Sequence, residues 1–241
     1  MSSFTITSFN ALWGRTTDGT PFDVPAVVER FDTDVISLQE VWDPADGAST
    51  LQEAAHAIGY EMIHVPLSGS RVDPRPEITP HPHEADGTWG VALLTRLPII
   101  STRTVDLGRM VERWDVADRY AILAELEVGT TAVTVAGLHL SFVLPNAAAQ
   151  LRRLRSYLPG HQPTVVAGDC NLWGPIAEAT LPGHRRAVRG RTWPAHRPHS
   201  QLDHILVSRA ITVVDGQVLL PAGSDHRPVR ATLQVAEPTT S

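Results

Sequence analysis

Asp169 and Asn171 directly follow the apolar run 165–168, Val-Val-Ala-Gly. Small and β-branched residues in such a run predict a buried strand, with a carboxylate and a carboxamide on the turn at its carboxyl end. In layered α/β proteins this edge collects ligands and catalytic groups, because the sheet holds side chains rigidly while the loops admit substrate. Asp and Asn also occur at strand ends because they form turns, so this turn alone leaves both interpretations open.

The same arrangement recurs elsewhere: a row of alternating residues, which share one face of a predicted strand, ends in a polar residue. The rows and the residues that end them are Phe4-Ile6-Ser8 with Asn10, Ile36-Leu38 with Glu40, and Val133-Val135-Gly137 with His139. Asp203 opens a further row, and Asp225 and His226 lie on a turn before the last predicted strand. Taken alone, His139 is better explained as a hydrogen-bonded core residue.

Carboxylates, carboxamides and histidines that converge on one sheet edge indicate a particular chemistry. Buried carboxylates are costly unless they are paired or bind a cation. Oxygen ligands, without a thiolate cluster or a His-x-x-x-His pair, suit a hard cation such as Mg²⁺ or Mn²⁺ better than zinc. Histidines beside carboxylates handle protons in hydrolytic sites. The residue types therefore predict a metal-assisted hydrolytic centre.

The elements that position these residues begin with a βαβαβ order, which indicates a layered α/β fold. The predicted helices cover 24–31, with Asp23 as N-cap, then 49–58 and 146–158. The predicted strands cover 4–10, 34–40, 60–65, 89–95, 99–106, 120–128, 131–139, 165–168, 201–208, 211–220 and 229–235. The four strands from 89 to 139 are expected to form one β-meander.

The Pro-rich segment 66–87 is predicted to be a long irregular loop, and loops of this length are more often functional than filler. His81 and His83 in this loop are better explained as solvated residues than as metal ligands. Cys170 alternates with Asp169 and Asn171, so it should face apolar packing if they face a site.

Length and composition limit the number of domains, the location and the kinds of partner. A chain of 241 residues, with 42% hydrophobic and 19% charged residues, is expected to form one domain over 1–236 with a frayed polar tail over 237–241. No apolar run reaches the roughly 18 residues of a membrane span. The single cysteine agrees with a reducing compartment, so the cytoplasm is the expected location. The net charge of −6 disfavours nucleic-acid binding through phosphate neutralisation without excluding it.

Six segments, in order along nearly the whole chain, resemble the motifs of the endonuclease/exonuclease/phosphatase superfamily, which includes DNase I, AP endonucleases, sphingomyelinases and inositol polyphosphate phosphatases. Each motif is weak, but the ordered set is specific. The resemblance implies a four-layered α/β sandwich, in which two mixed β-sheets pack face to face with helices outside. The segments are Ser8-Phe9-Asn10, Leu38-Gln39-Glu40-Val41, Gly137-Leu138-His139, Gly168-Asp169-Cys170-Asn171, Leu202-Asp203-His204-Ile205 and Ser224-Asp225-His226-Arg227-Pro228-Val229.

The resemblance also implies roles for individual residues. Glu40 would bind Mg²⁺ or Mn²⁺ directly, with Asn10 and Asp225 close by. Asp169 would orient or deprotonate the attacking water, and Asn171 would hold a phosphate oxygen.

In the same comparison Asp203 would pair with His226, and His139 would donate to the phosphate or protonate the leaving group. Arg119 matches a position where relatives often place a phosphate-contacting arginine, although a surface ion pair would explain it equally well. One feature departs from DNase I, where a glutamate before a Pro-Leu pair partners the histidine. Here the segment 65–67 reads Val-Pro-Leu, so a different group must orient His139, or it acts without a partner.

The expected function is metal-dependent hydrolysis of a phosphoester, most simply a phosphodiester. The acidic net charge favours a small or lipid-like ester over duplex DNA, while nucleic acid stays among the candidates. The alternative is a catalytically silent binding or regulatory module on the same fold. Silent members normally lose a ligand or a base, and here only the partner of His139 is in question. The chain is expected to be a monomer by default.

Overall fold

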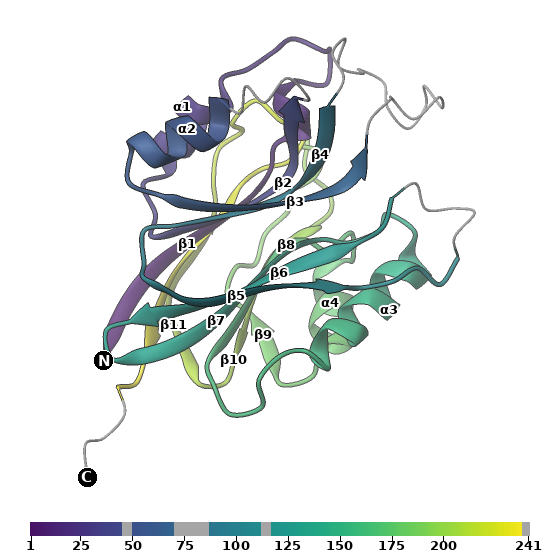
Figure 1. Ribbon diagram of the computed structural model, residues 1–241. Coiled ribbons are helices and arrows are strands. Elements are labelled where there is room, and N and C mark those ends of the chain that lie inside the picture. The colour runs from purple at the N-terminus through teal and green to yellow at the C-terminus, as the bar shows by residue number, and fades with distance from the viewer. Residues whose placement is uncertain (45–49, 70–86, 112–116, 238–241) are drawn as a thin grey trace.

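The computed structural model describes residues 1–44, 50–69, 87–111 and 117–237 (Figure 1). In this part of the chain the strands form two mixed sheets of six strands each. The first sheet has the order β11 (Ile211–Val218), β12 (Val229–Val235), β1 (Ser2–Asn10), β2 (Val35–Pro44), β4 (Gly87–Thr95), β3 (Glu61–Gly69). The second has the order β5 (Ile99–Asp106), β6 (Tyr120–Val128), β7 (Thr131–His139), β8 (Thr164–Asp169), β10 (Asp203–Ser208), β9 (His184–Arg186).

Helices cover the outer faces of both sheets, as Figure 1 shows. The helices α1 (Val24–Phe31) and α2 (Thr50–Ala57) pack on the first sheet, and α3 (Leu144–Arg155) and α4 (Gly174–Thr180) pack on the second. A single turn of 3-10 helix, η1 (Leu12–Gly14), follows β1. One apolar core lies between the sheets and another lies under each helix pair, so the predicted four-layered α/β sandwich is confirmed.

Because side chains alternate between the two faces of a strand, the predicted rows of β1, β7, β8 and β10 point into the core between the sheets. Phe4, Val133, Val165 and Ile205 all belong to this core, and each row carries its polar residue at the same edge. The parallel register of β7 and β8 pairs His139 with Asp169, and the antiparallel register of β10 and β8 pairs Asp203 with Asp169. Cys170 points the other way and is buried under the helices of the second sheet.

The prediction that Glu40 shares a face with Ile36 and Leu38 is wrong. Ile36 and Leu38 pack under α1 and α2, whereas Glu40 turns toward the second sheet. The pairing of β2 with β4 shifts between Gln39 and Val41, which marks a β-bulge, and Glu40 has a left-handed φ of 52°. A bulge inserts one extra residue and re-aims the side chains beyond it, which strict alternation does not anticipate.

The predicted meander is only partly correct. Strands β5, β6 and β7 are antiparallel neighbours in the second sheet, but β4 pairs with β2 and β3 in the first. The three-residue link 96–98 carries the chain from one sheet to the other. Alternation predicts which residues share a face of a strand, but it does not predict which sheet the strand joins. The short elements α4 and β9 are absent from the predicted set, because one contains Gly and Pro at its start and the other has three residues.

Two further expectations concern the ends of segments. Residues 66–69 extend β3 into the predicted loop 66–87, and residues 70–86, which include His81 and His83, lie outside the described residues. In the tail, Glu237 accepts a hydrogen bond from Ser2 Oγ at 2.9 Å, and residues 238–241 lie outside the described part. None of the described helices has both the length and the apolar character that a membrane crossing requires.

Gly168 explains why a glycine precedes Asp169. A Cβ atom built on Gly168 would lie 2.0 Å from Leu138 O on the neighbouring strand, so the strands could not keep their register. Gly168→Ala should therefore lower the free energy of unfolding by about 1–3 kcal/mol or more. Urea unfolding of the variant measures this loss.

Gly160→Ala is the matched control, because a Cβ at exposed Gly160 meets nothing within 4 Å. An equal effect of the two substitutions would contradict the proposed close approach of β7 and β8.

Candidate active site

Asn10 connects the polar residues of the two sheets. Its buried carboxamide Nδ2 donates to Glu40 Oε1 and to Asp169 Oδ2, both at 3.1 Å. Its Oδ1 accepts from the backbone N–H of Leu12 at 3.1 Å, which fixes the orientation of the amide group. One side chain at the end of β1 thus positions two carboxylates from different sheets.

Glu40 is a carboxylate with unused bonding capacity. Its Oε1 accepts from Asn10, but its Oε2 is buried and has no hydrogen-bond partner among the described residues. Burial raises the pKa of Glu40 to about 7, and the charges of Asp225 and Asp169 add to the rise. A buried carboxylate oxygen without a donor indicates a place where a cation would restore the charged form.

Asp169 lies at the centre of the group and is 1% exposed. Its Oδ1 accepts from the backbone N–H of Asn171 at 2.9 Å, and this turn uses a left-handed φ of 48° at Asn171, which asparagine tolerates. Burial raises the pKa of Asp169 to about 6, and the charge of Asp203 contributes, while His226, Asn171 and Asn10 oppose the rise. The carboxylate therefore titrates close to neutral pH.

Asp203 and His226 form a buried pair. His226 Nδ1 lies 2.8 Å from Asp203 Oδ2, and His226 Nε2 lies 3.7 Å from Asp169 Oδ2. Burial alone lowers the pKa of His226, but the carboxylates of Asp203 and Asp169 outweigh it and raise this pKa well above its usual value. His226 is accordingly the charged histidine of the site.

His139 has a different environment. Its Nε2 lies 3.4 Å from Asn171 Nδ2, 3.6 Å from Asp169 Oδ2 and 3.9 Å from Glu40 Oε1. Its Nδ1 is buried and has no hydrogen-bond partner in the described ranges, so no described carboxylate orients the ring from that side. Burial lowers the pKa of His139 well below its usual value, and the positive charges of Arg119 and His226 lower it further.

Trp89 lies near His139, and Arg119 lies over the Trp89 ring. The Trp89 and His139 ring centroids are 6.0 Å apart, and the Arg119 guanidinium lies 5.5 Å from the centroid of the Trp89 ring. Arg119 is only 2% exposed, so it is not the surface residue that the ion-pair explanation required. Trp89 shares a face of β4 with the core residues Val91 and Leu93. Alternation along this strand could therefore have identified Trp89 as a residue that faces the second sheet.

Asp225 lies on the loop before β12 and is held by a residue that the sequence did not single out. Trp193 Nε1 donates to Asp225 Oδ2 at 3.0 Å, and Ser224 Oγ donates to Asp225 Oδ1 at 3.3 Å. Asp225 is close enough to raise the pKa of Glu40. Trp193 lies in an irregular loop, where no periodicity could have identified it.

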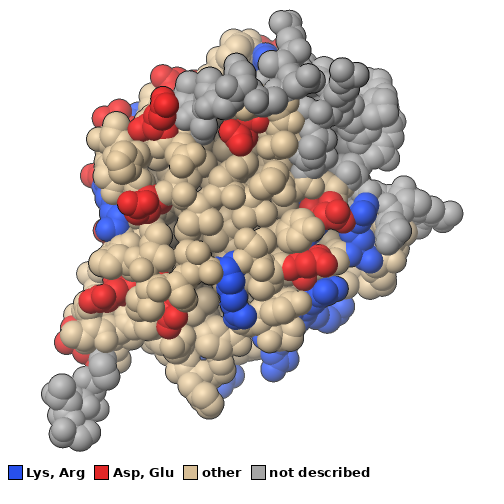
Figure 2. Space-filling view, viewed as in Figure 1, with Lys and Arg blue, Asp and Glu red and all other residues tan. Residues whose placement is uncertain are grey.

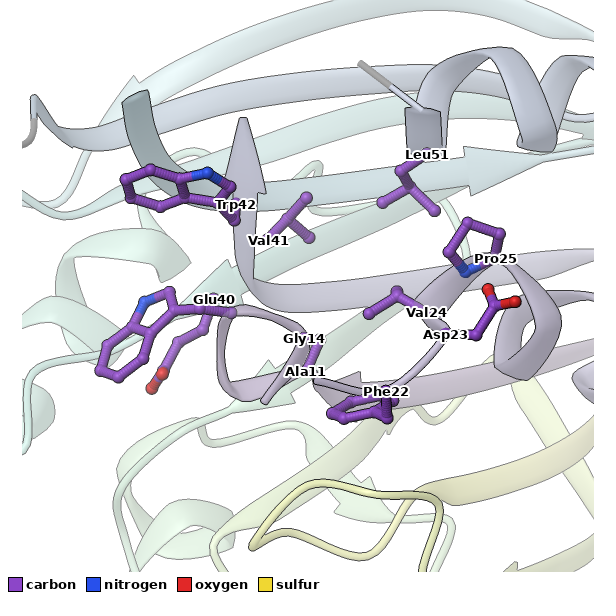
Figure 3. A pocket seen from close by; sticks show the side chains of 11 residues that line it. Ala11, Gly14, Phe22, Asp23, Val24, Pro25, Glu40, Val41, Trp42 and Leu51 are labelled. Carbon is purple, nitrogen blue, oxygen red and sulfur yellow. The ribbon is translucent and has the colours of Figure 1, made fainter. Parts of the chain in front are cut away.

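A pocket of about 390 Å³ opens beside Glu40 (Figure 3). The segment after β1, the start of α1, the end of β2 and Leu51 of α2 form its walls. Among the described residues that line it, the charged ones are Asp23 and Glu40, and both are acidic. The other lining residues are Ala11, Trp13, Gly14, Phe22, Val24, Pro25, Val41, Trp42 and Leu51. The pocket therefore suits an uncharged or cationic group better than a second phosphate.

The donors of this site fit a hard divalent cation. Asp169, Asp203 and His226 each offer a ligand atom, and these atoms lie within 4.8 Å of one another. The 2.8 Å contact already commits His226 Nδ1 to Asp203 Oδ2, whereas Asp203 Oδ1 and Glu40 Oε2 both lack a partner in the described chain. Both positions offer an oxygen donor that Mg²⁺ or Mn²⁺ prefers. Glu40 also lines the pocket, whereas Asp203 is fully buried, so Glu40 is the donor that a cation can reach from solvent.

Comparisons with known proteins agree with the fold. The family model described as the endonuclease/exonuclease/phosphatase family matches residues 7–226, a span that includes every candidate site residue. An endonuclease/exonuclease/phosphatase from Beutenbergia cavernae has a similar structure, with a TM-score of 0.78, 22% identity, and coverage of 100% of this chain and 74% of that chain.

Two other solved structures have the same fold. The catalytic domain of human Nocturnin with bound sulfate has a TM-score of 0.75 and 19% identity, over 97% of this chain and 95% of that chain. A mannosyl-6-phosphatase from Bacteroides thetaiotaomicron has a TM-score of 0.74 and 16% identity, over 96% and 99%. No curated protein matches the chain in sequence.

The buried pair predicts a measurable change in titration. Asp203→Asn removes a negative charge 2.8 Å from His226, so the pKa of His226 should fall toward its usual value or below it. NMR titration of the imidazole resonances in the metal-free protein measures this, with the His226 signal assigned from its loss in His226→Gln.

His184 is the internal control, because burial lowers its pKa to about 4 at the opposite end of β10, beside Ser208. An unchanged pKa of His226 in Asp203→Asn would show that the carboxylate does not hold the proton there.

Proposed function

This chain belongs to the endonuclease/exonuclease/phosphatase family, and we propose that it is a divalent-metal-dependent hydrolase that cleaves a phosphodiester by in-line attack of water. Members of this family are hydrolytic phosphoesterases, and the chain has their fold. The observation that carries the proposal is the buried Oε2 of Glu40, which has no hydrogen-bond partner in the described chain. Near Glu40 lie the Asp169 carboxylate and two histidines, of which His226 has a raised pKa and His139 a lowered pKa.

The metal would be held by Glu40, with Asn10 and Asp225 alongside. When bound, the cation would neutralise charge on the phosphate oxygens and favour deprotonation of water. Asn10 keeps the Glu40 carboxylate in place through the 3.1 Å hydrogen bond. Trp193 does the same for Asp225 at 3.0 Å.

Asp169 would orient the attacking water and accept its proton. Two hydrogen bonds, from Asn10 and from the backbone of Asn171, fix the position of the carboxylate. Its pKa of about 6 lies near neutral pH, which is favourable for a general base. The Asn171 side chain donates one amide proton to Leu140 O at 3.0 Å, which leaves the second for a phosphate oxygen.

The two histidines would act on the phosphate in different ways. His226, held in its charged form by Asp203, would supply a positive charge to the developing negative charge on the phosphoryl group. His139, which burial keeps neutral, would donate a hydrogen bond without adding charge. Arg119 would add positive charge on the His139 side of the substrate.

The charge distribution favours a small or lipid-like ester over duplex DNA. The formal net charge is −6, and the face in Figure 2 shows acidic and basic side chains interspersed among uncharged residues. A broad basic surface, which neutralises the phosphates of a long nucleic acid, does not appear on that face of the described chain. The acidic lining of the pocket beside Glu40 supports the same preference.

The proposed metal dependence is tested with bis(p-nitrophenyl) phosphate as a generic diester. EDTA should abolish turnover, and Mg²⁺ or Mn²⁺ should restore it. Glu40→Gln should raise the Mg²⁺ concentration needed for half-maximal rate by about 100-fold or more, because it removes the charged ligand. Glu29→Gln, an exposed glutamate on α1, is the matched control.

Full activity in EDTA would exclude the metal-dependent mechanism. Mg²⁺ binding without turnover of any phosphodiester or phosphomonoester in a panel would instead support the silent binding module.

A double-mutant cycle tests whether Asp203 and His226 act as one unit. His226→Ala and Asp203→Asn should each lower kcat by about 10² to 10⁴, because either change removes the same positively charged donor. The double variant should lose little more than one single variant, since interactions that depend on each other are not additive. Measured kcat values of the four proteins give the coupling.

His161→Ala, on an exposed loop, is the control. Additive losses of kcat, or losses of kcat fully explained by a lower melting temperature, would show that the pair has only a structural role.

A further inference from the structure

Five large apolar side chains are exposed around the carboxyl ends of β5, β7 and β8. They are Met110 at 60% exposure, Phe142 at 47%, Leu144 at 50%, Trp173 at 56% and Ile176 at 42%, and we refer to them as the apolar rim. The strands β7 and β8 carry His139 and Asp169 at these same ends. The described chain exposes four other large apolar residues. Met1 and Ile100 lie at the amino ends of β1 and β5, Val214 lies within β11, and Leu220 follows the carboxyl end of β11.

Buried polar side chains hold the rim in place. Asn146 Oδ1 accepts from the backbone N–H groups of Met110 and Val111 at 3.0 and 2.8 Å, and Gln150 Nε2 donates to Gly108 O at 2.8 Å. Asn146 and Gln150 are 0% and 1% exposed. These bonds tie the segment with Met110 to α3, so its exposed side chain is presented from a fixed position.

The starts of α3 and α4 are apolar where helices usually carry capping residues. The N-cap residues are Val143 and Trp173, and neither makes a side-chain capping hydrogen bond. By contrast, the side chain of Asp23 caps α1 in the usual way. Ser, Thr, Asp or Asn at these positions would stabilise the helices. The apolar N-cap residues therefore make α3 and α4 less stable than capped helices would be.

We propose that the apolar rim rests on a zwitterionic phospholipid surface and presents a headgroup phosphodiester to the site; this inference rests on the proposed phosphodiesterase function. Exposed apolar patches of this kind mark protein or membrane contacts. A permanent protein partner on this rim would cover the strand ends that carry His139 and Asp169. A lipid surface brings the substrate with it.

Charge favours a zwitterionic surface over an anionic one. The chain has a formal net charge of −6, which an anionic surface would repel. The pocket beside Glu40 combines the aromatic residues Trp13, Phe22 and Trp42 with acidic Asp23. Aromatic rings and carboxylates together suit a quaternary ammonium group, which a choline headgroup supplies next to its phosphate.

The test measures binding without turnover. The full chain in EDTA is sedimented with phosphatidylcholine vesicles, in wild-type form and as Phe142→Ser and Trp173→Ser. Each substitution should lower the partition coefficient about tenfold or more, because an aromatic side chain no longer leaves water on binding. Ile100→Ser, which removes an exposed apolar side chain at the amino end of β5, is the matched control and should bind as wild type does.

Two further measurements separate binding from folding and from chemistry. Trp173→Ser places a capping residue at the start of α4, so its melting temperature should not fall. Both rim variants should keep their turnover of soluble bis(p-nitrophenyl) phosphate and lose turnover of vesicle-borne phosphatidylcholine.

The outcomes distinguish the two proposals. Vesicle binding that depends on the rim, in a protein inactive on every phosphoester, would support the lipid contact and overturn the proposed function. Activity on soluble diesters without vesicle binding, equal loss in Ile100→Ser, or a dimer that Phe142→Ser dissociates would overturn the lipid contact.

Discussion

The carboxamide of Asn10 is the contact on which the arrangement of the site depends. It belongs to the first sheet and donates to Glu40 in that sheet and to Asp169 in the second. Without this donor two buried carboxylates would approach each other without a shared partner, which is costly in an interior of low polarity. The relative position of the two sheets at this edge is therefore coupled to the geometry proposed for the chemistry.

Burial lowers the pKa of both histidines, and their charged neighbours differ. Asp203 lies 2.8 Å from His226 and raises its pKa, whereas burial, with the positive charges of Arg119 and His226, lowers the pKa of His139. The sequence raised the question of what replaces the glutamate that partners the equivalent histidine in DNase I. In the described chain no carboxylate partners His139 Nδ1, and the imidazole is positioned by packing near Trp89, with its Nε2 facing Asp169 and Glu40.

Alternation along strands and the order of the elements predicted a layered α/β fold and several polar residues at one sheet edge, and the four-layered sandwich followed from the resemblance to the superfamily. The rows that end at Asn10, His139 and Asp169 face the core between the sheets, and so does the row that Asp203 opens. The face of Glu40 could not be predicted, because the bulge that re-aims it leaves no mark in a row of alternating residues. Residues in irregular loops, such as Trp193, also could not be predicted, because such loops have no periodic pattern.

The topology that places the chemistry at one edge also places the apolar rim there. The parallel strands β7 and β8 are joined through α3, whose first residue Leu144 follows soon after His139, and α4 begins at Gly174, soon after Asp169. Phe142 follows His139 by three residues, and Trp173 follows Asp169 by four. Because these links are so short, a surface that holds the rim also fixes the distance and orientation at which a phosphate meets the two strand ends. Substrate delivery and catalysis would then share one rigid edge, and no separate moving element would be required to bring them together.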